Sequence, residues 1–368
     1  MSQTTKSPGD FLREELEARR WTQADLAKIL DRPLPTINRI LQGKHAVLPE
    51  MAIALGQAFG NEPQIWMQRE YEYRLSLASL DTGDVRKRAR LYELAPIKDM
   101  QRRGWIHKTD KIDGLETELK AFFGVESLDR DPTISASARK TDASNPFNAA
   151  QRAWAFRAKQ LSQTLRVNEY SDAKLGVAIK KLRRLLGWPE QSRKVASILA
   201  ECGIRFVVVE PLPHTRIDGV AFWLDSNSPV IAMSMRFDRI DNFWHVLGHE
   251  MSHIRHRDDP AVDADSVIDE RPSSTGDEIE DRANREAAAT WIDKSELESF
   301  IDGVGPLYSR DKINQFANSL RVHPGIIIGQ LQGREELRFN AFRESLVKIR
   351  DTVTAEALTD GWGHEVGI

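Results

Sequence analysis

Apolar residues in the first part of the chain recur three and four positions apart, which is the spacing of amphipathic helices rather than of strands. The runs are short, and proline, glycine or polar residues separate them at points where helices begin and end. Thr22 is the clearest start, because Asp25 stands three positions later and completes a capping box. The pattern predicts five helices between residues 8 and 77, and the third, over residues 35–42, has an apolar side of Ile37, Ile40 and Leu41.

After residue 149 the pattern becomes mixed. Three runs rich in β-branched and other apolar residues predict strands at 204–210, 219–224 and 230–235. Helical spacing predicts helices on both sides of them, at residues 149–164, 171–186, 189–201, 241–257, 279–292, 309–320 and 324–332. Residues 258–278 are acidic and rich in turn formers, which is typical of a solvated loop. The chain shows no internal repeat.

Residues 78–148 separate the two patterns. A basic, helix-like stretch covers residues 85–103, and its residues 86–90 read as a solvated helix face that could add phosphate contacts. Residues 129–148 have the composition of a linker. We therefore predict a multidomain chain. An all-α N-terminal domain (1–77) is followed by a helical middle region with a linker (78–148), an α+β domain with a small β-sheet (149–335), and a C-terminal helical extension with a tail (336–368).

The composition is that of an ordinary globular protein, with 40% hydrophobic and 29% charged residues among 368. Basic residues number 52 and acidic residues 55, and the net charge of −3 excludes a globally basic coat for nucleic acid. Cys202 is the only cysteine, so neither an internal disulfide nor a zinc site built from cysteines can form. The sequence contains neither a membrane-length apolar run nor an apolar leader near its start, and we expect a cytoplasmic protein.

The strongest chemical signal is the sequence His249-Glu250-Met251-Ser252-His253, an H-E-x-x-H motif. Residues four apart on a helix share one face, so both imidazoles can bind one metal ion. Glu250 lies beside them, where its carboxylate can accept a proton from water. A catalytic zinc site needs a third protein ligand and keeps a further position open.

The third ligand has two kinds of candidate. His245 and His256 lie near the same helix face, one turn before and about two turns after the first histidine. Glu280 begins a second helix rich in small residues, and Asn284, one turn later, can hydrogen-bond a ligand. Glu286 of the same helix is interpreted as a surface charge.

Residues 241–292 resemble the ImmA/IrrE family of zinc metallopeptidases, in which H-E-x-x-H on one helix precedes E-x-x-A-[ND]-x-x-A-A on the next. The resemblance implies a zincin-like fold with Zn²⁺ as cofactor. It implies that His249, His253 and Glu280 are the zinc ligands and that Glu250 is the catalytic base. Glu286 stands where that family usually has an aromatic residue.

The N-terminal residues resemble HigA-like antitoxins, which carry an Xre-type helix-turn-helix. The resemblance rests on Pro8-Gly9-Asp10-Phe11-Leu12, Trp21-Thr22-Gln23, Leu26-Ala27, Arg32-Pro33, Thr36-Ile37-Asn38, Gly43-Lys44 and Trp66. It implies DNA binding, autorepression of an operon and neutralisation of a toxin. An alternative is that these residues form a helical module for protein interaction.

In a helix-turn-helix, the second helix of the motif enters the major groove. Four residues of the third predicted helix remain available for contacts with bases, because they lie outside its apolar side. They are Thr36, Asn38, Arg39 and Gln42. Gln23 and Lys44 are expected at phosphates. Residues 1–75 hold ten basic and ten acidic residues, so affinity would rest on a homodimer that spans two half-sites.

These features together predict an antitoxin-type DNA-binding regulator that carries a zinc-dependent peptidase-like domain. The expected partners are double-stranded operator DNA, a cognate toxin, a protein substrate such as a regulator, and a second copy of the chain. The alternative is a non-proteolytic antitoxin whose second half is a toxin-binding or sensing scaffold. We expect no membrane partner, and a place on the nucleoid when DNA is bound.

Overall fold

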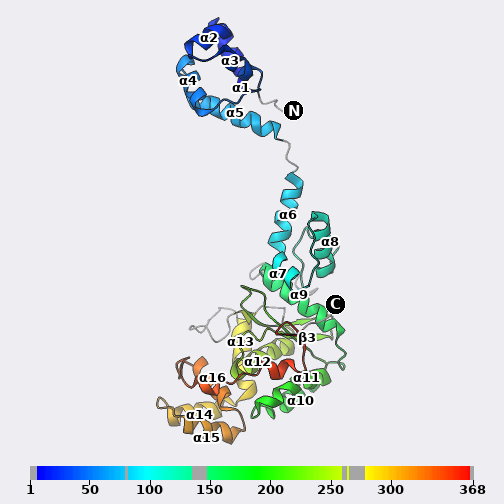
Figure 1. The fold of residues 1–368 in the computed structure, drawn as a ribbon. Coiled ribbons are helices and arrows are strands. Elements are labelled where there is room, and N and C mark those ends of the chain that lie inside the picture. Colours follow the sequence, from blue (N-terminus) through cyan, green and yellow to red (C-terminus); the bar gives the residue numbers. More distant parts are fainter. Residues whose placement is uncertain (1–5, 79–81, 135–146, 259–262, 265–277, 365–368) are drawn as a thin grey trace. The chain divides into compact units, whose positions relative to one another are not determined.

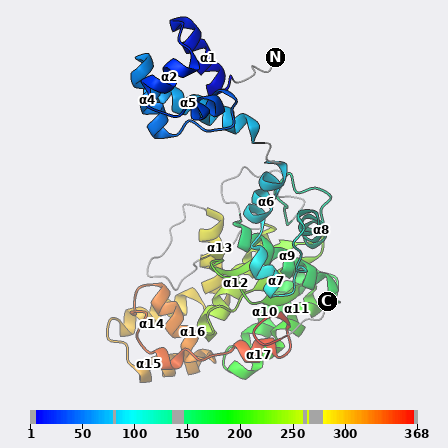
Figure 2. The same ribbon diagram turned by 45° about the horizontal axis from the view of Figure 1, so that its top comes forward.

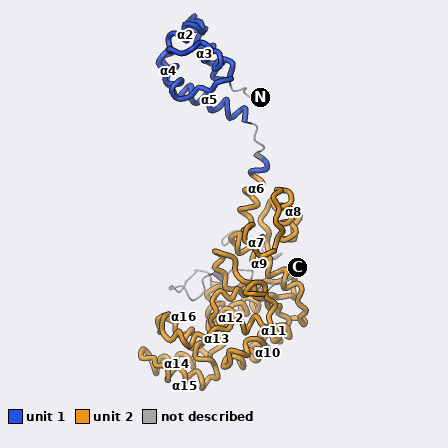
Figure 3. The backbone as a smooth tube through the Cα atoms, viewed as in Figure 1, with its two compact units in different colours: residues 1–85 blue, residues 86–368 orange. Residues whose placement is uncertain are grey.

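The protein is described by a computed structural model that covers residues 6–78, 82–134, 147–258, 263–264 and 278–364 (Figure 1). A second view shows the same elements from another side (Figure 2). The chain divides into two compact units, residues 1–85 and 86–368 (Figure 3).

Unit 1 is all helical, as the hydrophobic pattern predicts. Its five helices are α1 (Pro8–Arg19), α2 (Gln23–Ile29), α3 (Leu34–Leu41), α4 (Pro49–Phe59) and α5 (Pro63–Leu77). Trp66 of α5 is fully buried, and its ring lies 4.8 Å from Phe11 and 5.7 Å from Phe59. The predicted capping box is confirmed, since Thr22 and Asp25 exchange hydrogen bonds at the start of α2.

The helices of unit 2 surround one small sheet. They are α6 (Thr82–Leu94), which begins before the boundary between the units, α7 (Ile97–Arg102), α8 (Ile112–Phe123), α9 (Ala149–Thr164), α10 (Asp172–Arg183), η2 (Pro189–Lys194), α11 (Val195–Cys202), α12 (Ile240–His256), α13 (Glu278–Trp291), α14 (Lys294–Val304), α15 (Arg310–Leu320), α16 (Pro324–Gly333), η3 (Arg343–Ser345) and α17 (Arg350–Thr354). No helix among the described residues is long and apolar enough to cross a membrane.

The sheet has five strands in the order β4-β2-β3-β1-β5. Their bounds are β1 (Arg205–Val209), β2 (Ile217–Trp223), β3 (Pro229–Met233), β4 (Asp263–Ala264) and β5 (Leu358–Asp360). β1 is parallel to β3 and β5, whereas β2 is antiparallel to β3 and β4. Alternate strand residues face opposite sides, so Val208 packs with α11 and α12 while Val207 packs with α8 and α9.

The expected divisions of the second half differ from this arrangement. Helices α7 and α8 of the predicted middle region share a core with α9 and the sheet, so no compact unit ends at residue 148. Most of the predicted linker, residues 135–146, lies outside the described residues. The basic stretch at 85–103 is partly engaged, because Lys87 pairs with Asp113 and Glu116 and Arg90 pairs with Asp131.

The prediction that residues 336–368 form a helical extension and a tail is wrong in one respect. Residues 358–360 form β5, which pairs with β1, and Val353 lies in the main core of unit 2. The helix predicted at 189–201 is instead the 3₁₀ helix η2 followed by α11. Of the predicted acidic loop, residues 258–278, the structure describes only residues 258, 263–264 and 278. Residues 263–264 form β4, which pairs with β2.

The turn between α15 and α16 shares two features with the turn between α2 and α3. The first turn residue is left-handed in both, with φ of 50° at Asp31 and 57° at Arg321. The next N–H donates to an alanine carbonyl at 2.9 Å in both, from Arg32 to Ala27 and from Val322 to Ala317. Ile37 and Leu41 match Ile327 and Leu331 at constant spacing.

Candidate functional site

The candidate DNA-reading element is α3 of unit 1. Ile37, Ile40 and Leu41 are buried in the unit 1 core, as predicted, so the opposite side of the helix faces outward. Of the six residues proposed for DNA, four are exposed: Gln23, Arg39, Gln42 and Lys44.

The other two proposed contacts, Thr36 and Asn38, are only partly exposed. The side-chain oxygen Oδ1 of Asn38 is buried and has no hydrogen-bond partner among the described residues. Asn38 therefore lies at the margin of the outward face, because it stands one residue from buried Ile37 on the helix. Arg39 and Gln42 present the more accessible polar groups.

Helix α1 holds α3 in place. A Cβ added to Gly9 would lie 2.7 Å from the carbonyl oxygens of Ile40 and Leu41, so the backbones of the two helices meet closely there. Arg13 of α1 donates from Nη2 to the carbonyl oxygen of Leu41 at 2.6 Å. The end of α3 is thus fixed by α1, and its outward side chains are carried on a rigid support.

The candidate metal centre lies between α12 and α13. His249, His253 and Glu280 each offer one ligand atom, and these atoms lie within 4.8 Å of one another. The two histidine Nε2 atoms are 2.9 Å apart, and Glu280 oxygens lie 3.2 Å from His249 Nε2 and 3.6 Å from His253 Nε2. Two imidazole nitrogens and one carboxylate form the His₂Glu set that suits a catalytic zinc ion.

The outer nitrogens of both histidines are occupied by oxygen acceptors. His249 Nδ1 lies 3.0 Å from Asn284 Oδ1, and His253 Nδ1 lies 2.9 Å from Asp258 Oδ2. Such contacts fix the tautomer that leaves Nε2 available to a metal. In addition, Oε1 of Glu280 is buried without a hydrogen-bond partner among the described residues. The donor set therefore fits a divalent cation.

Asp258 was missed by sequence reasoning, which assigned it to a solvated loop. Its side chain is buried and also pairs with Arg282 of α13, so it links the end of α12 to the neighbouring helix. The available signal was its position five residues after His253. That spacing places it just past the helix end, where Arg257 turns left-handed and returns the chain toward the histidine.

The electrostatics favour the metal-binding protonation states. Burial, together with the nearby His249, lowers the pKa of His253 below its ordinary value, which favours the neutral imidazole. Burial acts to raise the pKa of Glu280, but the hydrogen bond and charge of His249 outweigh it and lower this pKa. A neutral imidazole and an ionised carboxylate are the forms that ligate metal.

Glu250 is almost fully buried and lies against strand β2. A Cβ added to Gly219 would lie 2.5 Å from Glu250 Oε1 and 2.9 Å from Val246. The pairing of β2 with β4 is irregular between Ile217 and Gly219, as at a β-bulge. The absence of a side chain at Gly219 therefore leaves room for the carboxylate proposed as general base.

The other candidates take different places. Neither His245 nor His256 belongs to the ligand cluster. Glu286, interpreted from the sequence as a surface charge, instead accepts from Ser252 at 2.8 Å and lies 2.9 Å from His256 Nε2. It joins α13 to α12 at the position where the resembled family has an aromatic residue.

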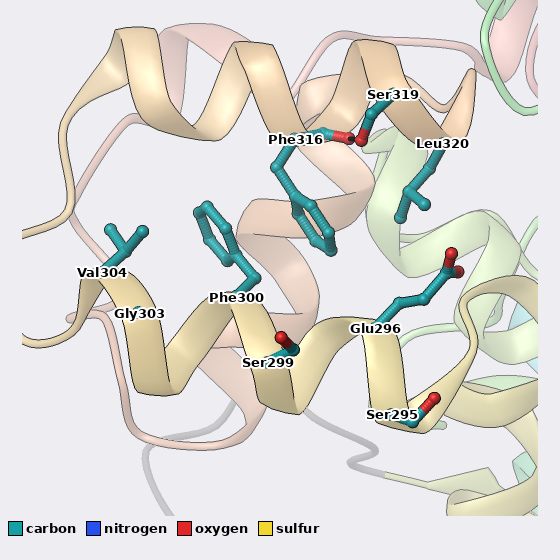
Figure 4. A pocket seen from close by; sticks show the side chains of 9 residues that line it. All are labelled: Ser295, Glu296, Ser299, Phe300, Gly303, Val304, Phe316, Ser319 and Leu320. Carbon is teal, nitrogen blue, oxygen red and sulfur yellow. Dashed lines mark hydrogen bonds between the residues drawn. The ribbon is translucent and has the colours of Figure 1, made fainter.

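A separate groove of about 650 Å³ lies between α14 and α15 (Figure 4). Phe300 and Phe316 line it, with their rings stacked and the ring centroids 4.2 Å apart. Polar residues, Ser299 and Ser319 among them, also line it. None of the candidate metal ligands lines it.

A helix-turn-helix family model matches residues 12–66. The uncharacterized HTH-type transcriptional regulator YddM of Escherichia coli K12 is 34% identical over 84 residues, which are 23% of this chain and 88% of YddM. The chain therefore belongs, through its N-terminal unit, to the helix-turn-helix family of transcriptional regulators.

Solved structures with local likeness include two from Pseudomonas aeruginosa. PA4674 in complex with its operator DNA is 34% identical, and the match covers 21% of this chain and 85% of that one. Antitoxin HigA with the higBA promoter is 36% identical, with 20% and 82% covered. The TM-score is 0.20 in both cases.

Proposed function

We propose that this chain is an antitoxin-type, DNA-binding transcriptional regulator that represses its own operon and carries a zinc-dependent peptidase-like site. The observation that carries the proposal is the presence of two separate polar arrays. One is the exposed side of α3, and the other is the convergence of His249, His253 and Glu280 beside Glu250. The antitoxin character rests on the resemblance of residues 8–66 to HigA-like sequences.

For DNA, Arg39 and Gln42 are the principal base-reading side chains, because both are exposed on α3. Gln23 and Lys44 contact phosphates, and Thr36 and Asn38 contribute at the margin. Unit 1 reads two half-sites as a homodimer, and the outward side of α5 supports this. Met67, Tyr71 and Leu75 lie one turn apart there and are 36%, 66% and 59% exposed.

The DNA proposal is tested by fluorescence anisotropy with a labelled duplex from the chain's own promoter region. Arg39→Ala should weaken binding to this duplex and reduce its preference over a scrambled duplex. Lys28→Ala on α2 is the control, because Lys28 is exposed and is not among the proposed contacts. Equal binding by wild type and Arg39→Ala would remove α3 as the reading element.

For the second site, His249, His253 and Glu280 would hold a zinc ion, which would supply Lewis-acid polarisation of a peptide carbonyl and acidify water. Asn284 and Asp258 orient the two imidazoles. Glu250 accepts a proton from the attacking water and delivers it to the leaving amine. The proposed substrate is a regulatory protein, in keeping with the resemblance to ImmA/IrrE peptidases.

The peptidase proposal is tested by comparing the proteins of cells that express wild type with those of cells that express Glu250→Gln. The variant should keep its zinc and accumulate the uncleaved form of a protein that wild type removes. If Glu250→Gln retains zinc and every cleavage product persists, Glu250 is not the base. This result would contradict the proposed proteolytic function.

One observation favours a second candidate function, a non-proteolytic antitoxin. The groove between α14 and α15 is lined in part by Phe300 and Phe316, contains none of the candidate metal ligands, and could receive a toxin segment. Under this alternative, Asn38→Ala combined with Arg39→Ala abolishes operator binding and leaves toxin neutralisation intact, and Glu250→Gln changes neither. Loss of both activities in the double variant would contradict separable roles.

A further inference from the structure

A cationic surface of unit 2 belongs to neither proposed site. Residues 174–194 hold seven basic residues and one acidic residue, Glu190. Some of the basic side chains have partners within unit 2. Lys181 pairs with Glu201 at 2.5 Å, Arg193 pairs with Glu356 at 3.6 Å, and Arg183 donates to main-chain oxygens at the end of α13.

Lys180 and Arg184 differ from these, because both are exposed and form no ion pair among the described residues. They lie one turn apart, about 6 Å along the helix axis, on the outward side of α10. The inward side of that helix is apolar and buried, formed by Leu175, Ala178 and Leu182. Their two positive charges therefore point to solvent from a rigid support.

Two further groups extend this surface beyond α10. Trp188 follows Arg184 by four residues and is 50% exposed, and its indole carries one N–H donor. Arg321, the residue that ends α15, is also exposed, and its carbonyl oxygen lies against Gly187. Burial lowers the pKa of His323, and the nearby charge of Glu190, the one acidic residue of the stretch, acts to raise it.

We propose that Lys180, Arg184, Trp188 and Arg321 form a contact surface for the phosphate backbone of duplex DNA, called here the α10 basic surface. Three cations and one N–H donor are the groups that proteins place on phosphates. Duplex DNA suits this surface because its phosphates carry closely and regularly spaced negative charge. Unit 1, with ten basic and twelve acidic residues, supplies little general attraction of its own for DNA. Phosphate contacts supply most sequence-independent affinity.

The inference rests on the proposed DNA binding by unit 1 and assigns a different role to unit 2. The α3 side chains select the sequence, whereas the α10 basic surface adds affinity for any duplex. Loss of the surface should therefore lower binding to operator and scrambled duplexes by the same factor. Loss of Arg39 should act on the operator alone.

The test measures binding of the full chain to a labelled scrambled duplex by anisotropy over a series of salt concentrations. Each phosphate contact contributes about 0.9 to the slope of log affinity against log salt, so Lys180→Gln with Arg184→Gln should reduce the slope by about two. Trp188→Ala should weaken binding with little change in slope, because it removes no charge.

The matched control is Lys98→Gln with Lys312→Gln, which changes the net charge equally at two exposed lysines elsewhere on unit 2. The control should keep the wild-type slope. If the α10 double variant also keeps that slope while wild type binds DNA, the α10 basic surface is not a DNA contact. If wild type binds neither duplex, the proposed DNA function itself falls, and this inference falls with it.

Discussion

The chain contains two helix pairs with one turn geometry, α2–α3 and α15–α16, and they differ in what covers the second helix. In unit 1 the outward side of α3 is open, and Arg39 and Gln42 are exposed. In unit 2 the matching helix is enclosed, since Ile326, Ile327, Ile328, Leu331 and Gln332 of α16 are all buried.

The cover over α16 is α12, the helix that carries His249 and His253. Ile327 and Leu331 share a core with Val246 and Leu247 of α12. Gly329 occupies the position that Arg39 has in α3, and a Cβ there would strike Asp241 of α12. The helix pair proposed to present side chains to DNA in unit 1 thus has a counterpart in unit 2 that supports the candidate metal helix.

The difference indicates that a similar turn between two helices is not enough to make the second helix a candidate for reading DNA. The turn fixes the crossing of two helices, but access to the second helix decides whether it can enter a groove. In α16 an apolar residue, Ile328, replaces Asn38, and a glycine replaces Arg39. The sequence of the second helix, more than its geometry, separates recognition from support.

The largest expected effect on stability comes from truncating a buried leucine in the second helix of each pair. Leu41→Ala and Leu331→Ala should each lower the free energy of unfolding of their own unit by about 2–5 kcal/mol, because both leucines are buried and leave a cavity. Hydrogen exchange of the α3 and α16 amides measures the two costs separately. Leu41→Ala should weaken DNA binding and spare zinc binding, and Leu331→Ala should do the reverse. Loss of zinc in Leu41→Ala would contradict the separation.

The next effect concerns the close approaches at each second helix. Gly9→Ala places a methyl 2.7 Å from the α3 carbonyl oxygens, and Gly329→Ala places one against Asp241. Overpacking of this kind costs about 1–3 kcal/mol, so both variants should unfold at lower denaturant concentration than wild type. Gly176→Ala is the control, because nothing lies within 4 Å of the added Cβ. A neutral Gly329→Ala would show that α16 is not tightly held by α12.

A glutamine at matching positions sharpens the comparison. Gln42 is exposed, whereas Gln332 is buried and bonded to Arg239 at 3.1 Å and to the Ala341 carbonyl at 3.1 Å. Gln332→Ala should cost about 1–3 kcal/mol of unfolding free energy, because it leaves buried partners unsatisfied. Gln42→Ala should leave stability within about 0.5 kcal/mol and weaken operator binding. Denaturant unfolding and anisotropy distinguish them, and equal stability losses would contradict the assigned exposure.

The smallest effect concerns the turns that the two pairs share. Asp31 and Arg321 both adopt left-handed backbone, which glycine accepts without strain. Asp31→Gly and Arg321→Gly should therefore each change stability by less than about 1 kcal/mol, with a gain where relief of strain exceeds the added entropy of the unfolded chain. Thermal unfolding measures the change. A large loss in one variant alone would show that its side chain does more than end a helix.

The sequence predicted the helices of unit 1 well, because their amphipathic spacing and caps are local features. Thr22 and Asp25 form the predicted capping box, and Ile37, Ile40 and Leu41 are the predicted core of α3. The likeness of α15–α16 to α2–α3 is not apparent from the sequence because only buried positions match, and apolar residues at helical spacing are common to all helices.

Long-range features were also beyond the sequence. β5 is three residues long and pairs with β1, which lies about 150 residues earlier in the chain. No local sequence pattern therefore predicts this strand. Asp258 reaches His253 only because the chain reverses after α12. His249, His253 and Glu280 were proposed together because a motif and a resemblance joined them, and the structure brings their ligand atoms within 4.8 Å.

The central claim is that α16 supports a metal-binding α12 while α3 reads DNA. Elemental analysis of purified full-length protein tests its metal half most directly. Wild type should contain about one zinc ion per chain, His249→Ala should lose it, and Arg39→Ala should keep it. Absence of zinc from wild type after zinc is supplied, or equal zinc in His249→Ala, would contradict the account and favour the scaffold alternative.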